Sequence, residues 1–139
     1  MMHWSVYALL SAVFAALVAI FGKIGLREVD STLATTVRSI VMALFLVAVS
    51  FGLGKFAFLG TITNKALIFI ILSGIAGALS WLFYFFAIKF GPVTGVVGID
   101  KTSVIFAFVL AVLFLSEAFT WTKALGAVLV GAGALLMAL

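Results

Sequence analysis

Apolar residues fall into five long runs, separated by short breaks that hold most of the charged residues. The runs cover residues 4–22, 33–53, 66–88, 93–116 and 122–139. Each has about the length that an α-helix needs to cross a hydrocarbon core of about 30 Å. A membrane-spanning strand needs only about half as many residues, so the runs are too long to be strands. The pattern predicts an all-α membrane protein whose five transmembrane helices form a single domain over residues 1–139.

The composition indicates that the apolar surface of the folded chain faces lipid rather than water. Of the 139 residues, 67% are hydrophobic and 9% are charged, whereas about a quarter are charged in a soluble domain. The chain has no cysteine and one histidine, His3, which argues against disulfides and metal sites. No catalytic triad, P-loop or dinucleotide fingerprint is present. We therefore expect no enzyme activity, no catalytic residue, no cofactor and no metal, and the scattered net charge of +4 indicates no nucleic-acid partner.

The charges between the runs bear on orientation in the membrane. Five spans put the termini on opposite sides, so the N-terminal side receives three cations and the other side four: Lys55, Lys65 and Lys123 against Lys23, Arg27, Arg38 and Lys89. This near balance gives the positive-inside rule little to act on. We therefore predict dual topology and an antiparallel homodimer; the alternative is one orientation, with the four-cation side in the cytoplasm.

Ionisable residues inside two of the runs are the first candidate site. Asp100 and Lys101 lie within the fourth run and Arg38 within the second, where an unpaired charge costs several kcal/mol. Successive residues of a helix point about 100° apart, so Asp100 and Lys101 are not expected to neutralise each other. We predict a polar cluster of Lys23, Arg38, Asp100 and Lys101 that lines a cavity and binds or couples the solute. The alternative is that Arg38 and Lys101 reach toward headgroups while Asp100 pairs with one of them.

An aromatic stretch in the third run is the second candidate. Trp81, Tyr84 and Ile88 recur at helical spacing and share one face. Inside a bundle, Trp81 and Tyr84 would stack on an organic substrate or hold a cation. The alternative is an interfacial aromatic belt, which suits Trp4 at the edge of its run.

Small residues and one proline mark places where helices approach closely or weaken. Gly126, Ala127 and Gly131 lie in the fifth run, and we predict that they pack a dimer contact. Pro92 and the glycines of residues 91–98 indicate either a broken start to the fourth run or an ordinary helix start with proline in the first turn. Glu117, which ends that run, is expected to anchor a loop.

Several motifs, in order, resemble an EamA-type domain of the drug/metabolite transporter superfamily. They are Ala15-Ala16 with FGKIGL at 21–26, AIKFG at 87–91, VLFLSE at 112–117, and ALGA and LVGAG at 124–127 and 129–133. Each motif is loose, but together they span nearly the whole chain. The resemblance implies one five-helix repeat of a fold that usually occurs twice, with inverted copies around a central cavity.

Two departures limit what the resemblance implies. Many members have a proline where this chain has residues 98–101, and the four-helix multidrug branch has an essential acid in its first helix, where this chain has none. The proton-coupling residue of that branch therefore has no counterpart here. If coupling is protonic, Asp100 is the best acid within the membrane, although the nearby cations oppose its protonation.

The leading hypothesis is a small secondary transporter in the lipid bilayer of a cell membrane, expected to be a prokaryotic inner membrane. It moves a small-molecule substrate such as a metabolite, amino acid or drug by alternating access as a homodimer. The alternatives are a non-transporting subunit of a hetero-oligomeric membrane complex and a channel.

Overall fold

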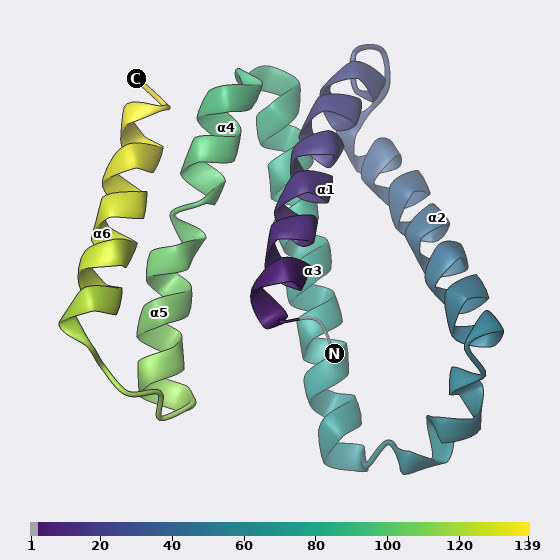
Figure 1. Cartoon of the computed structure of the whole chain (residues 1–139). Helices are drawn as coiled ribbons and strands as arrows, with labels where there is room; N and C mark the ends of the chain where they lie inside the picture. Colours follow the sequence, from purple (N-terminus) through teal and green to yellow (C-terminus); the bar gives the residue numbers. More distant parts are fainter. Residues whose placement is uncertain (1–2) are drawn as a thin grey trace. The chain divides into compact units, whose positions relative to one another are not determined.

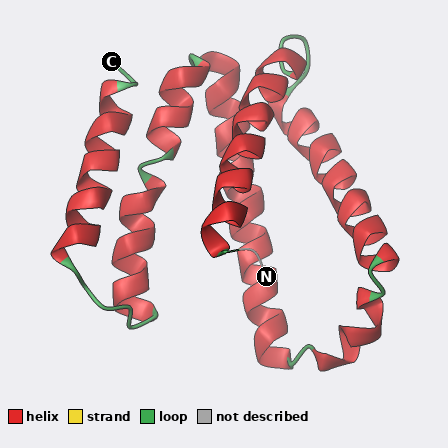
Figure 2. Cartoon of the chain, viewed as in Figure 1, coloured by secondary structure: helices red, strands yellow, loops and turns green. Residues whose placement is uncertain are grey.

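The fold is entirely helical over the residues described, 3–139, in a computed structural model of the chain (Figure 2). The α-helices are α1 (Trp4–Gly25), α2 (Ser31–Gly52), α3 (Asn64–Phe90), α4 (Val93–Asp100), α5 (Ser103–Phe114) and α6 (Trp121–Leu136), and η1 (Lys55–Thr61) is a 3₁₀ helix (Figure 1). Four spans, α1, α2, α3 and α4 with α5, are long and apolar enough to cross a membrane. The 16 residues of α6 are fewer than the about 20 that a straight span needs.

The predicted spans are confirmed as helices, with two differences. The fourth run, expected as one helix over 93–116, is divided into α4 and α5 by a turn at Lys101 and Thr102. The break at 54–65 contains the short helix η1, which the sequence pattern did not indicate. At the start of α4, Pro92 directly precedes the helix, so the ordinary helix start holds there and the break lies further along.

The chain separates into two compact units. One contains residues 1–24 and 90–139, and the other contains residues 25–89. In the first unit, α6 packs along α4 and α5, which lie end to end beside it (Figure 1). In the second unit, η1 joins α2 to α3, and these two helices spread apart toward η1 (Figure 1).

Polar contacts at helix ends hold the loops in both units. The Nζ of Lys23, in the last turn of α1, donates to the carbonyl of Gly91 at 2.9 Å. In the other unit, Lys89 in the last turn of α3 donates to the carbonyl of Val29 at 2.8 Å. Cations suit these positions because a helix C-terminus carries partial negative charge. Asp30 caps α2, and the hydrogen bond from the Leu33 N–H holds the pKa of its carboxyl below the usual range.

Small residues let α6 approach α4 and α5 closely. A Cβ added to Gly98 of α4 would lie 2.9 Å from the Cβ of Met137 and 3.0 Å from the carbonyl oxygen of Ala134. A Cβ added to Gly131 of α6 would collide with the Cδ1 of Ile105. Van der Waals contact is the main attraction between helices in lipid, so these close approaches stabilise the first unit.

Substituting Gly98 is expected to loosen this packing. Gly98→Ala should lower the free energy of unfolding by about 1–3 kcal/mol, because the added methyl group meets the backbone of α6. The matched control is Gly133→Ala in α6, where an added Cβ meets nothing within 4 Å. That change should be neutral or stabilise by up to about 1 kcal/mol. SDS-titration unfolding in mixed micelles measures both, and equal effects of the two substitutions would contradict the proposed contact.

The end of α5 stores backbone strain at Ser116. Its φ of 54° lies in the left-handed region, and the N–H of Glu117 donates to the Ala111 carbonyl at 3.2 Å to close the helix. Ser116→Gly should raise the free energy of unfolding by about 1 kcal/mol, because glycine adopts this conformation without a Cβ clash. Ser50→Gly, inside α2, should instead lower it by about 1 kcal/mol in the same unfolding titration.

Candidate functional site

A groove lies between α2 and α3 in the second unit. Its volume is about 590 Å³. Its lining residues are Thr32, Thr35, Thr36, Ser39, Ile40 and Ala43 from α2, and Ile75, Ala78, Leu79 and Leu82 from α3. The two sets recur three and four residues apart, so each forms one face of its helix. The groove therefore has one wall with hydroxyl groups and one wholly apolar wall.

The hydroxyl groups of this groove have a defined orientation. Thr35, Thr36 and Ser39 each donate to the backbone carbonyl four residues earlier, at 2.7, 2.9 and 2.8 Å. Their hydrogens are therefore used within α2, while each oxygen keeps lone pairs that can accept from a donor in the groove. The sequence interpretation missed this stripe, although threonine and serine at positions 32, 35, 36 and 39 of an apolar span are a visible signal.

Arg38 adjoins the groove residue Ser39 in the chain, but neither Arg38 nor its ring partner Trp81 is among the residues that line the groove. Its guanidinium carbon is 3.7 Å from the centre of the Trp81 ring and 5.4 Å from that of Phe85. Trp81 in turn precedes the groove residue Leu82. Both ion pairs that the structure holds among residues 3–139 join other residues, so Arg38 has a ring partner there but no carboxylate partner.

The aromatic residues of α3 form one cluster beneath this cation. The Trp81 and Tyr84 rings meet edge to face with centroids 5.3 Å apart, and Phe85 lies 5.9 Å from Trp81. Phe85 and Ile88 are buried, whereas Trp81 and Tyr84 are half-buried. The shared face of Trp81, Tyr84 and Ile88 is thus turned toward protein. The Trp81 ring on this face holds the guanidinium of Arg38.

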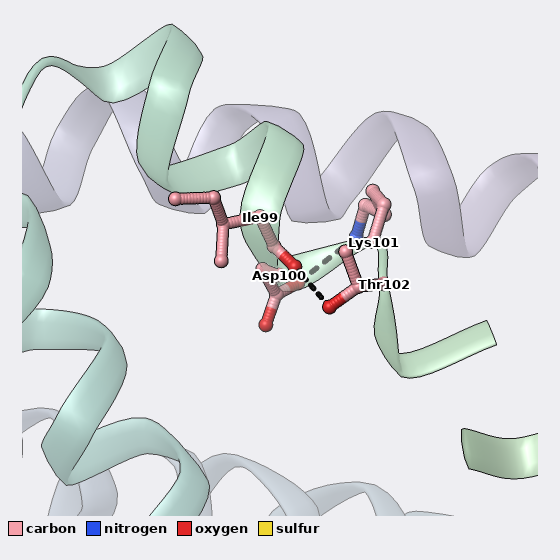
Figure 3. A network of polar contacts seen from close by, with 4 residues as sticks. All are labelled: Ile99, Asp100, Lys101 and Thr102. Atoms are coloured by element: carbon pink, nitrogen blue, oxygen red, sulfur yellow. Dashed lines mark hydrogen bonds and ion pairs between the residues drawn. The ribbon is translucent and has the colours of Figure 1, made fainter. Parts of the chain in front are cut away.

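Asp100 and Lys101 form an ion pair, contrary to the expectation from helical geometry. The Nζ of Lys101 lies 3.2 Å from Oδ2 of Asp100 (Figure 3). The expectation was wrong because it considered only the directions in which the two side chains leave the helix. Lys101 keeps right-handed helical dihedrals (φ −69°, ψ −12°), and its long side chain reaches the neighbouring carboxylate.

The backbone of this turn is satisfied by tighter hydrogen bonds. The N–H groups of Thr102 and Ile105 donate to carbonyls three residues earlier, each at 2.9 Å. The hydroxyl of Thr102 adds a 2.7 Å bond to the carbonyl of Ile99 (Figure 3). Irregular backbone inside a membrane span needs such compensation, because lipid supplies no hydrogen-bond partners.

The predicted cluster of Lys23, Arg38, Asp100 and Lys101 draws on both units. In the first unit, Lys23 binds the Gly91 carbonyl while Asp100 and Lys101 pair with each other. In the second unit, Arg38 stacks on Trp81. Each of the four residues thus contacts a partner within its own unit. A single cluster of all four stays a prediction.

The small residues predicted for a dimer contact divide into two kinds. Ala127 and Gly131 are buried within the chain, and Gly131 faces Ile105 of α5. Gly126 is exposed, and an added Cβ there meets nothing within 4 Å. Of the three, Gly126 is therefore the residue that a second copy can contact. Glu117 pairs with Lys123 at 3.5 Å and so joins the two ends of the α5–α6 loop.

Comparison with known proteins identifies the family of this chain. The sequence model of the EamA-like transporter family matches residues 2–139. The chain belongs to the EamA-like transporter family. A relative from Sinorhizobium sp., named an uncharacterized transporter in the cobO 3' region, is 38% identical over 135 residues, which cover 97% of this chain and 96% of the relative. No solved structure matches the chain significantly.

Membership of the EamA-like family confirms the resemblance drawn from the motifs. Together with the apolar helices, it makes the chain a membrane protein with a transporter role, and it points away from an enzyme.

Proposed function

We propose that this EamA protein is a small secondary transporter that moves a small organic solute across the cell membrane by alternating access as a homodimer. The groove between α2 and α3 carries the proposal. It combines an apolar wall with hydroxyl groups, and the same two helices hold the Arg38 guanidinium over the Trp81 ring. Ionisable groups in membrane spans usually line a solute or ion path. The relative's printed name, a transporter, supports the same role.

The homodimer is the assembly that the resemblance favours. The family match covers residues 2–139, and the Sinorhizobium relative, covered to 96%, has nearly the same length. The resemblance implies two copies around a central cavity, and a second copy of this chain in the opposite orientation supplies the other half. The near balance of cations on the two sides supports both insertions.

Counterflow in proteoliposomes tests the transport mechanism. A thermal-shift screen of the purified protein against metabolites and drugs first selects solutes. We expect an unlabelled solute on one side to accelerate uptake of the labelled solute from the other, because a carrier exchanges its substrate as it alternates. Steady currents without exchange would indicate a channel. Purification bound to a different polypeptide, with no flux, would indicate a subunit of a larger complex.

A matched pair of substitutions links flux to the groove. Ala78→Phe places a ring in the groove and should abolish counterflow. Ala87→Phe, on an exposed position of α3 outside the groove, should leave it unchanged. Assembly is tested separately: light scattering should give the mass of two chains, and C-terminal reporters should report from both compartments.

A further inference from the structure

The guanidinium of Arg38 is held over the Trp81 ring, but neither of the ion pairs found among residues 3–139 includes it. Arg38 is the eighth residue of α2, so it lies about 10 Å along the helix axis from the first. Stacking at 3.7 Å covers one face of the guanidinium with the Trp81 ring. The N–H donors of a guanidinium lie in its plane and point outward from its edge, so a stacked arginine keeps its edge for another ligand.

We propose that Arg38, oriented by Trp81, binds the carboxylate of the transported solute and so makes the protein selective for organic carboxylates. This inference rests on the proposed transport function. A carboxylate accepts two parallel N–H bonds from one guanidinium, which fixes its orientation as well as its charge.

The charge at this site favours a carboxylate over a phosphate ester. Arg38 is the one cation that α2 contributes, and the cations of α3, Lys65 and Lys89, lie at its two ends. A single guanidinium neutralises a monoanion, whereas a phosphate ester carries nearly two negative charges at pH 7. The groove wall itself includes no acidic residue that would repel an anion.

The fluorescence of Trp81 provides a direct test. In a Trp4→Phe and Trp121→Phe background, Trp81 is the only one of the three tryptophans that remains. The protein is placed in phosphatidylcholine nanodiscs and titrated with isovalerate, lactate and phenylacetate, and with the neutral amide of each. We expect saturable fluorescence changes with at least one carboxylate and none with its amide.

Variants of the cation complete the test. Arg38→Gln should weaken the response about tenfold to hundredfold, as expected for the loss of hydrogen bonds to a charged group. Arg38→Lys should keep a weaker response, because it retains the charge but not the paired donors. The matched control is Arg27→Gln, which removes an exposed loop cation and should change nothing.

Each contrary result has a distinct meaning. Equal responses to carboxylate and amide, an undiminished response in Arg38→Gln, or no response to any of the three acids would overturn the carboxylate assignment. So would a response to inorganic phosphate alone, or one that appears only when phosphatidylglycerol is added to the nanodiscs, which would assign Arg38 to a headgroup. Carboxylate binding without counterflow would instead refute the transport function and leave this assignment standing.

Discussion

Replacing Trp81 with alanine is expected to lower the free energy of unfolding by about 2 kcal/mol, because Arg38 loses the ring that covers it. The guanidinium carbon lies 3.7 Å from the ring centre, nearer than it lies to the Phe85 ring and nearer than Lys55 lies to the Phe58 ring. A guanidinium within a membrane span has few alternative partners, so the loss is larger than at an aqueous surface. Phe85, at 5.4 Å, replaces only part of the contact.

Controls separate this interaction from the loss of an aromatic ring as such. Phe83→Ala removes a ring of the same helix that is 67% exposed, and it should cost clearly less. Trp81→Phe should retain part of the interaction because a smaller ring still offers a π-face. A double-mutant cycle of Trp81→Ala with Arg38→Met, read by SDS-titration unfolding, should give a coupling energy of about 1–2 kcal/mol. Additive effects would show that the two side chains do not interact.

Removing Lys101 is the second substitution with a large expected effect. Lys101→Ala leaves the Asp100 carboxylate without its 3.2 Å partner inside the span formed by α4 and α5. An unpaired charge at membrane depth costs up to about 3 kcal/mol, and partial exposure of this pair reduces the expected loss to about 2 kcal/mol. Exchanging the two residues, Asp100→Lys with Lys101→Asp, should restore most of the stability because opposite charges remain adjacent.

The Glu117–Lys123 pair is the matched control for this prediction. It is also a lysine–carboxylate contact, at 3.5 Å, but it joins Glu117 in the loop after α5 to Lys123 in the first turn of α6, and both side chains are more than half exposed. Lys123→Ala should therefore cost less than about 1 kcal/mol. Unfolding titrations of both alanine variants in the same micelles make the comparison. Equal losses would mean that Asp100 is no more dependent on its partner than a residue in water.

The sequence anticipated the helices better than it anticipated their interruptions. Long apolar runs specify helices directly, since a spanning segment must satisfy its own backbone. The break at Lys101 was not predicted: the fourth run was expected as one helix over 93–116, and the one weak point considered lay at residues 91–98, where proline is the stronger local signal. The polar residues Asp100, Lys101 and Thr102 end α4 through tight hydrogen bonds that no single-residue preference reveals.

For the candidate site, residue types were more predictable than partners. Arg38 and Trp81 were each selected from the sequence, as an intramembrane charge and a deep aromatic residue. Their contact was not, because helical spacing defines faces within one helix but not which faces of two helices meet. Burial of Ala127 and Gly131 inside the chain, rather than on an open dimer face, was undetermined for the same reason.

The amino-acid sequence by itself determined that this protein is a helical membrane protein of the EamA type, because the lengths of its apolar runs and the order of its motifs are local properties. Tertiary structure decided that Arg38 stacks on Trp81, that Gly131 faces Ile105, and that α2 and α3 enclose a groove with hydroxyl groups on one wall. Lipid removes most of the hydrophobic drive between helices, so small residues and polar contacts select which faces meet. Those contacts depend on three-dimensional juxtaposition, which the pattern along a chain does not encode.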